Sequence, residues 1–157
     1  MLPEPLHNIV SSFQQADQQL RLELLVDYAN KLPSLPPQLE TERELGLNQL
    51  PECRTPVHLW VEADPVMGTE LHAHAREEAP TVRGMLSVLV HGCRGAPPKQ
   101  VAELPSDLIQ QLGLDQVLRM QRQIRINLVL ERIRREVPEA LARELSARDL
   151  DWMAEHK

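Results

Sequence analysis

Aromatic side chains are scarce in this chain of 157 residues. One Phe, one Tyr and two Trp are present, so the hydrophobic core must be built mainly from Leu, Val and Ile. The apolar content of 42% is that of a globular protein. A single domain of this length buries about two-thirds of its unfolded surface, so neither a disulfide nor a structural metal is needed to stabilise it.

Long apolar runs and a secretory signal are also absent. No run of about 18 apolar residues, the length that spans a bilayer, occurs anywhere. Residues 1–8 lack a basic segment followed by an apolar one. With 23 acidic against 17 basic side chains, the net charge of -6 disfavours wholesale binding to nucleic acid or anionic membrane. We therefore expect a cytoplasmic protein, with neither nucleic acid nor membrane as a partner.

Cysteine is limited to Cys53 and Cys93. In the reducing cytoplasm, such residues are more often free or catalytic thiols than a structural bridge. Cofactor motifs are missing too, since no lysine site of the pyridoxal-phosphate type and no glycine-rich phosphate loop is evident. We therefore expect no resident cofactor.

Two alternating segments predict an antiparallel hairpin. In residues 57–62 every second side chain is apolar, the period of a half-buried strand, and residues 70–75 alternate in the same way. Residues 63–68 between them have the composition of a turn. A third strand is expected before Cys53, although residues 38–48 show no clear strand pattern.

Helical patterns lie on both sides of this hairpin. Residues 6–13 have apolar side chains at helical spacing, and Asp17 is placed to cap a second helix. Pro80 suits the first position of a helix that Gly92 ends. Further helices are predicted over residues 108–112 and from about residue 115 to residue 135, with Pro138 expected to break the last one.

This order of elements predicts an α+β fold, in which a small antiparallel sheet of about three strands packs against N- and C-terminal helices. Residues 1–137 are expected to form one domain. Residues 138–157 are expected to be a charged helical C-terminal extension.

Cys53 is the candidate for the reacting atom. It lies in a loop between Pro51 and Pro56, directly before the first predicted strand, where a side chain can be presented while the backbone stays anchored. The alternative is that Cys53 is a small buried hydrophobe, the commoner fate of a free cysteine. The neighbouring polar residues Glu52, Arg54 and Thr55 would make a poor core environment for it.

Residues 53–61, Cys-Arg-Thr-Pro-Val-His-Leu-Trp-Val, resemble the Cys-Gln-Ser-x-Val-Trp block of the SufE family, the sulfur acceptors that partner cysteine desulfurases in iron-sulfur cluster assembly. Residues 74–84, which contain His-Ala and then Ala-Pro-Thr-Val-Arg-Gly, are similar to that family's next block. Residues 112–134 resemble its closing helical segment. The matches keep one order from about Leu24 to Val137, which is more specific than any single motif.

The chain departs from the family pattern at several positions. Cys-Gln-Ser is replaced by Cys-Arg-Thr at residues 53–55, Asp-Ser-Asp is replaced by Arg-Glu-Glu at residues 76–78, and Arg125 stands where the closing segment has a glycine. Partner-facing residues are therefore expected to differ from those of other members.

The resemblance implies a mechanism of sulfur transfer. The Cys53 thiolate would attack the persulfide on a cysteine desulfurase of the SufS or CsdA kind, become a transient persulfide and pass the sulfur to a scaffold of the SufBCD kind. The chain would then be a transfer partner and activator of the desulfurase rather than a stand-alone enzyme. Residues predicted to contact the partner, because they match the family's motifs, are Arg54, His74, Glu78, Arg83, Gly84 and Arg122.

Structural roles compete with these assignments. Arg83 is suited to a salt bridge at a helix start, Gly84 to close packing of that helix against the sheet, and Arg122 to a solvated helix surface. His72 and His74 could bind a metal together with Cys53, but polar surface is the commoner role of such a pair.

Two other functions remain open from the residues alone. A dithiol redox enzyme would use Cys53 and Cys93, as long as their Cα atoms come within about 7 Å in some state. A non-catalytic interaction domain would need neither cysteine. Cys93 could also be a second sulfur station, although an incidental cysteine at a helix end is the simpler interpretation.

Overall fold

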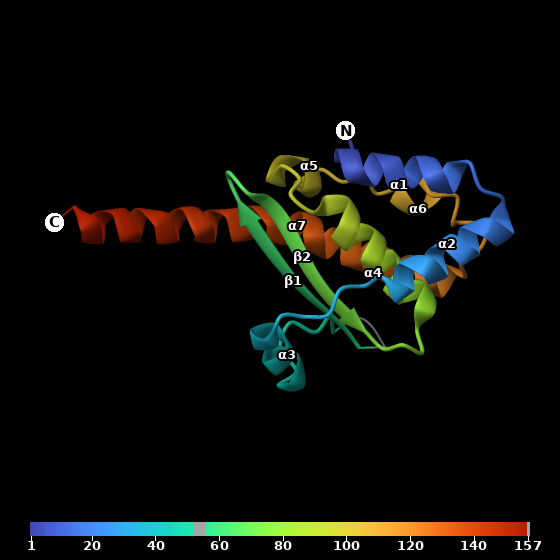
Figure 1. Ribbon diagram of the computed structural model, residues 1–157, viewed down its shortest axis with the longest axis horizontal. Coiled ribbons are helices and arrows are strands. Elements are labelled where there is room, and N and C mark those ends of the chain that lie inside the picture. Colours follow the sequence, from blue (N-terminus) through green and yellow to red (C-terminus); the bar gives the residue numbers. More distant parts are fainter. Residues whose placement is uncertain (52–55, 157) are drawn as a thin grey trace.

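A computed structural model describes residues 1–51 and 56–156 of the chain. Its elements, in chain order, are α1 (Glu4–Gln14), α2 (Gln18–Asn30), α3 (Pro37–Glu44), β1 (Val57–Asp64), β2 (Gly68–Ala75), α4 (Pro80–Cys93), α5 (Pro98–Ala102), α6 (Leu108–Gln111) and α7 (Met120–Glu155). A long hairpin crosses the molecule, most helices lie on one side of it, and α3 lies beside its lower end (Figure 1). The predicted α+β class is confirmed.

The hairpin is confirmed, with a shorter turn than expected. β1 and β2 pair antiparallel from Val57 opposite Ala75 to Asp64 opposite Gly68. The Asp64 carboxylate accepts the backbone N–H groups of the next turn residues at 2.7 and 2.8 Å, and Gly68 has a φ of 85°, so this turn is fixed by its own residues. The expected sheet of about three strands is wrong in its count. Within the described residues the sheet has two strands, and the preceding segment adds a single bridge, Gln49 to His58.

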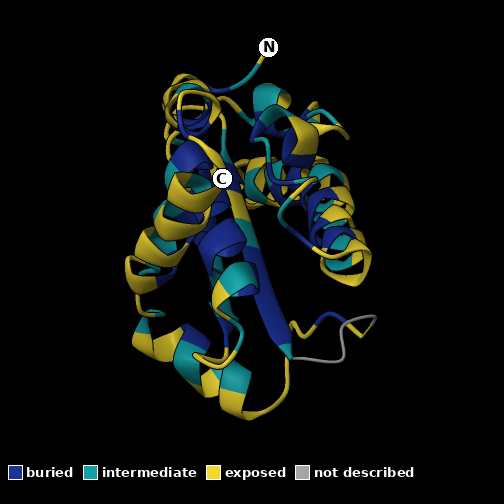
Figure 2. Ribbon diagram, turned by 90° about the vertical axis from the view of Figure 1, so that its right-hand side faces the viewer, coloured by how far each residue is buried: buried dark blue, intermediate teal, exposed yellow. Residues whose placement is uncertain are grey.

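Both faces of β1 are covered near its start. Val57 and Leu59 face the helices, as their alternation predicts, but His58 and Trp60 on the other face are also buried. The expectation of a half-buried strand therefore fails here, because residues 47–49 lie against His58 and Leu59 and bond to them. Figure 2 shows the buried residues running through the strand region and along the inner sides of the helices.

Helix α4 is the central helix of the core. It begins at Pro80, as predicted, and packs against α1, α2, α7 and β2. Asp17 caps α2 as predicted, since its carboxylate accepts the N–H of Leu20 at 2.9 Å. These local signals fixed where the two helices start.

The end of the chain differs from the prediction. α7 begins at Met120 rather than near residue 115, and it continues through Pro138 to Glu155. Pro138 removes one backbone hydrogen-bond donor from α7, and its ring is exposed. The helix stays continuous because Val137 and Ala140, on either side of it, are held in the core. The proposed boundary between residues 137 and 138 thus falls inside one helix. Among the described helices, none is both long enough and apolar enough to cross a membrane.

Candidate functional site

The segment that contains Cys53 is hydrogen bonded at its two ends. The N–H of Leu50 donates to the carbonyl of Val57 at 2.8 Å. Cys53 and Arg54, both predicted site residues, fall within residues 52–55 and so lie outside the described part of the chain. Leu50, before this segment, and Val57, the first residue of β1 after it, are therefore held next to each other by a backbone hydrogen bond.

Further bonds tie the residues before this segment to β1. Nδ1 of His58 lies 2.9 Å from the carbonyl oxygen of Leu47, so this nitrogen bears the proton and donates. Asn48, at a φ of 57°, donates from its side chain to the carbonyl of Leu59 at 3.2 Å and accepts the N–H of Leu59 at its backbone carbonyl at 3.0 Å. Asn tolerates this left-handed conformation better than most residues. Residues 47–50, which lead into the cysteine segment, are thus held in place against β1.

Arg83 joins three elements at the same end of the hairpin. Its Nη1 donates to the carbonyl of Ala75 at 2.6 Å and its Nη2 to the carbonyl of Ala29 at 3.4 Å. Ala75 is the residue paired with Val57. Arg83 therefore connects the start of α4 to the ends of β2 and α2, through backbone carbonyls rather than through the predicted salt bridge.

A polar cleft of about 510 Å³ opens beside this end of the hairpin. It brings together three predicted site residues, His74, Glu78 and Arg83. The exposed residues 76–78 form one wall. The cleft is also lined by Leu32, Pro33, Ser34, Leu35, Glu40 and Ala75.

The charged side chains of Arg43 and Glu40 affect the protonation of His74 in the cleft. Partial burial is the main cause that lowers the pKa of His74, and the nearby Arg43 guanidinium adds to the effect. Arg43 is itself bound to Glu40, with Nε 2.9 Å from Oε1, and this bond lowers the pKa of the Glu40 carboxyl. His74 is therefore neutral at pH 7 and can exchange a hydrogen bond with a partner group.

Gly84 lies away from the cleft surface. A Cβ atom added there would be 2.4 Å from the carbonyl oxygen of Leu25 and 2.8 Å from its side chain. Gly84 therefore allows α4 to approach α2, not the sheet as predicted. Because it is buried, it does not present a surface to a partner.

Arg122 is exposed on the first turn of α7 and does not line the cleft. Arg125, one turn further along, packs with Val57 around a small gap between α4 and α7. The first turns of α7 therefore lie next to the start of β1. Arg122, in these turns, is an exposed charge that is separate from the cleft.

The comparisons with known proteins agree in one family. Residues 7–137 match the SufE family, described as an Fe-S metabolism associated domain. The chain belongs to the SufE family. It is 37% identical over 88% of its length to uncharacterized SufE-like proteins from two strains of Mycobacterium tuberculosis, covering 95% of each. It is 32% identical over 72% of its length to an uncharacterized SufE-like protein of Synechocystis, covering 67% of it.

A solved structure has the same fold. The solution structure of a hypothetical protein from Thermus thermophilus matches with a TM-score of 0.77 at 28% identity, over 89% of this chain and 98% of that one. The SufE resemblance read from the motifs is therefore confirmed, and the family places this chain in iron-sulfur metabolism.

Cys93 is unsuited to nucleophilic chemistry in this SufE-family structure. Its side chain is fully buried in the core, and burial raises the pKa of the thiol to about 12. The thiolate is the reactive form, so Cys93 would be protonated and inaccessible at neutral pH. This geometry disfavours the dithiol redox alternative.

The other histidine of β2, His72, lies near an acid. Its Nε2 lies 3.6 Å from a carboxylate oxygen of Glu62 on the neighbouring strand. In the described part of the chain, no three His, Cys, Asp or Glu side chains converge in an arrangement suited to a metal ion. His72 thus has a partner on the sheet itself.

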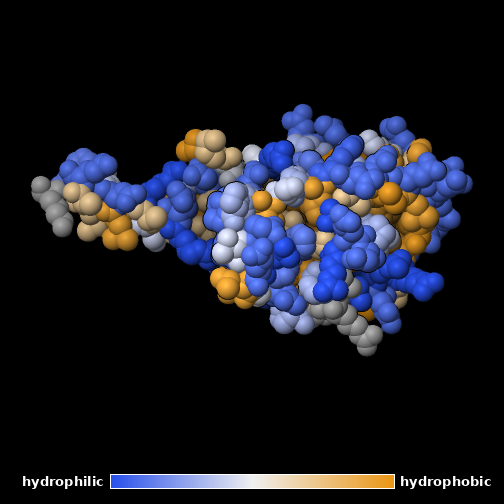
Figure 3. All heavy atoms as spheres, turned by 60° about the horizontal axis from the view of Figure 1, so that its bottom comes forward, coloured by the Kyte–Doolittle hydropathy of each residue, from blue (hydrophilic) through white to orange (hydrophobic). Residues whose placement is uncertain are grey.

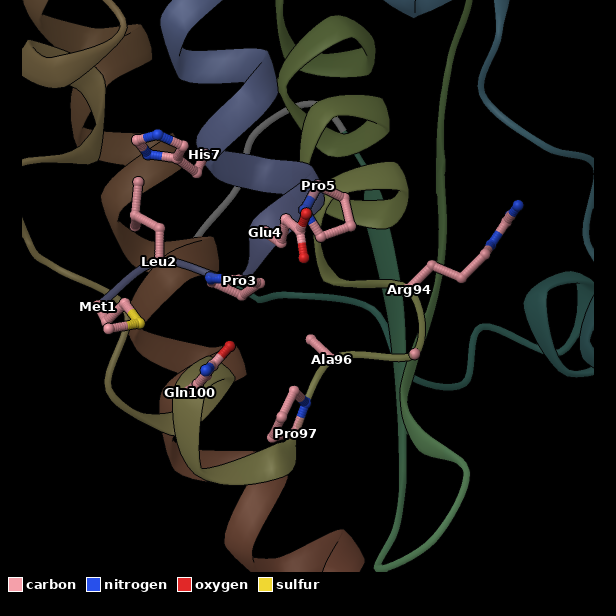
Figure 4. Close-up of a pocket in the computed structure, with 11 residues that line it drawn as sticks. Met1, Leu2, Pro3, Glu4, Pro5, His7, Arg94, Ala96, Pro97 and Gln100 are labelled. Atoms are coloured by element: carbon pink, nitrogen blue, oxygen red, sulfur yellow. The ribbon is translucent and has the colours of Figure 1, made fainter.

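A hollow larger than the polar cleft lies at the opposite end of the hairpin. It has a volume of about 680 Å³ and lies between the N-terminal segment and residues 94–100 (Figure 4). Thr69, at the turn end of β2, is bonded there to the carbonyl of Ala96. The lining of this hollow includes no predicted site residue, so the volume of a cavity alone does not identify the functional site.

Several residues that shape the site had not been singled out. Asn48 bonds the segment before Cys53 to Leu59 of β1. Glu40 and Arg43 form an ion pair within α3 that acts electrostatically on His74. His58 is buried, although the alternation of β1 places it on the face away from the helices. The Asn-Gln pair before Leu50 and the Glu40/Arg43 spacing were available signals, since Asn favours left-handed turns and charges three residues apart pair on a helix.

Proposed function

We propose that this protein accepts sulfane sulfur on Cys53 from the persulfide of a cysteine desulfurase. The supporting observation is the hydrogen-bonded pair Leu50 and Val57, which anchors the cysteine segment beside the cleft of His74, Glu78 and Arg83 in a chain of the SufE family. A reactive residue between fixed anchors can reach a partner without loss of the fold.

The transfer is a thiol exchange with no net oxidation. The Cys53 thiolate attacks the outer sulfur of the desulfurase persulfide, and a new S–S bond forms to Cys53. The original S–S bond breaks, and the desulfurase cysteine leaves as a thiolate. A thiol on an iron-sulfur scaffold then removes the sulfur from Cys53 by the same exchange, so both partners are regenerated.

The surrounding residues have distinct roles in this proposal. Arg54 next to Cys53 favours the thiolate, and Arg83 holds the hairpin end from which the cysteine segment emerges. His74 and Glu78 contact the desulfurase from the cleft, and Arg122 contacts it from α7. The cytoplasm, where we expect this reaction, keeps Cys53 reduced between transfers.

Intact mass after incubation with a cysteine desulfurase and free cysteine tests the proposal. A reducible gain of about 32 Da on Cys53 is expected, because one sulfur atom is added. Cys53→Ser should abolish the gain, whereas Cys93→Ser should keep it. No adduct with a panel of desulfurases would favour an interaction domain. A loss of about 2 Da that joins Cys53 to Cys93 would favour the redox enzyme.

Docking is tested separately by the turnover of the desulfurase. Glu78→Lys and Arg122→Glu should weaken stimulation by the protein, since each reverses a charge proposed to contact the partner. Glu103→Lys, outside the cleft, and Arg119→Glu, three residues before Arg122, are controls at exposed positions. Equal effects at all four positions would indicate general charge steering and remove the specific roles of Glu78 and Arg122.

A further inference from the structure

The last turns of α7 project beyond the body of the molecule (Figure 1). The final buried residue of this helix is Ala140, and the helix continues to Glu155. Arg148 fixes the base of the projection, because its guanidinium pairs with Asp64 at the hairpin turn and with Glu144 one turn earlier in the helix. Residues 141–155, which include no buried residue, would be marginal as an isolated helix in water.

Large apolar side chains remain exposed along α7. Two lie in its first turns and four in the projection, where apolar surface is visible at the free end in Figure 3. Their exposed fractions run from 46% to 67%, well above those of core residues, which makes them an uncovered surface rather than core. They are Met120, Ile124, Leu145, Leu150, Trp152 and Met153.

The charges of α7 are divided between its halves. Residues 119–135 contain six Arg and one Glu, whereas residues 136–155 contain six acidic residues and two Arg. The helix macrodipole favours the reverse order, with acids near the N-terminus and bases near the C-terminus. The stability of the isolated helix therefore does not account for this arrangement.

We propose that a second copy of this chain packs antiparallel along the solvent face of α7. In that arrangement the basic half of each helix lies against the acidic half of the other. Leu150, Trp152 and Met153 near the end of each projection then lie against Met120 and Ile124 of the partner copy. Such a pairing is two-fold symmetric, and its axis passes near Val137, the middle of the helix. A parallel pair would instead place like charges together.

The apolar surface is sufficient for this interface. Six exposed side chains per copy at roughly 100 Å² each give about 1,200 Å² in the pair, within the range of stable interfaces. The charged residues on both sides add a polar rim. The apolar residues that carry this inference include no residue of the cleft, and Arg122, which the proposed function assigns to the desulfurase, is not among them.

The first test measures the oligomeric state of the full chain by sedimentation over micromolar concentrations. The native chain should form a dimer, and Leu150→Glu should raise its dissociation constant at least tenfold. Leu45→Glu, directly after α3, is a matched control, since Leu45 and Leu150 are 72% and 67% exposed. A native chain that stays monomeric, or a dimer that both variants leave intact, would overturn the proposal.

The second test uses residues near the two-fold axis. Arg135 of one copy should lie close to Glu139 of the other, so Arg135→Glu and Glu139→Arg should each weaken self-association through like charges. When the two variant chains are mixed, opposite charges meet at both positions and a mixed dimer should form. Absence of the mixed dimer, with both chains helical by circular dichroism, would exclude the antiparallel pairing.

Discussion

The guanidinium of Arg83 donates to the backbone carbonyl of Ala75 at 2.6 Å, directly across the strand pair from Val57. This bond fastens the start of α4 to the end of the hairpin that directly follows the cysteine segment in the chain. The geometry makes Arg83 a structural support of the candidate site as well as part of its surface.

Replacing Arg83 should therefore cost stability. Arg83→Ala removes charge-assisted donors from the carbonyls of Ala75 and Ala29, and the free energy of unfolding should fall by about 1.5–3 kcal/mol. Urea denaturation measures this change. Arg76→Ala, at an exposed position on the same cleft, should change stability by no more than about 0.5 kcal/mol. Equal effects of the two substitutions would contradict the supporting role.

Gly84 should not tolerate a side chain. Gly84→Ala places a Cβ against the carbonyl of Leu25, so α2 and α4 must separate, and stability should fall by about 1–3 kcal/mol. Ser87→Ala in the same helix is the control. The buried Ser87 hydroxyl has no hydrogen-bond partner in the described structure, so its removal should be neutral or stabilising. The melting temperatures of both variants test this prediction. A Ser87→Ala chain that melts below Gly84→Ala would contradict it.

The buried thiol of Cys93 predicts a loss of stability at alkaline pH. Burial raises the pKa of this thiol to about 12, whereas an unfolded cysteine titrates near about 8.5. Above the unfolded value, the unfolded state releases a proton that the folded state retains, so stability falls as pH rises from about 8.5 toward 12.

Urea midpoints from pH 7 to pH 10 measure this loss. Cys93→Val has no thiol to titrate and should show a smaller decline over the same range. An identical slope for both chains would mean that Cys93 titrates normally in the folded state.

Pro138 lies within α7 without ending it, and this too can be tested. Pro138→Ala restores a backbone donor toward the carbonyl of Arg134, so stability should rise by about 1–3 kcal/mol. Ser146→Ala, at another exposed position of α7, should add only a few tenths of a kcal/mol, since it changes propensity alone. Circular dichroism during thermal unfolding measures both. A destabilised Pro138→Ala chain would indicate that the proline shape is required.

Local patterns predicted much of the fold. The alternation of residues 57–62 and 70–75 predicted the hairpin, and Asp17 and Pro80 predicted where two helices start. The site was predicted in part. The motifs selected His74, Glu78 and Arg83, which the fold brings into one cleft, whereas Arg122 lies apart from them and Gly84 is buried. Cys53 and Arg54 remain predictions, since they lie outside the described residues.

The sequence by itself determined the hairpin, the starts of α2 and α4 and the family, because periodicity, capping and motif order depend on residues near one another in the chain. Only the tertiary structure decided that α7 continues through Pro138, that His58 and Trp60 are buried, and that Arg83 binds carbonyls of Ala75 and Ala29. Each of these depends on contacts between residues far apart in the chain, and such packing can outweigh a local preference. The burial of Cys93 has the same origin, since the core to which it belongs forms only in the folded chain.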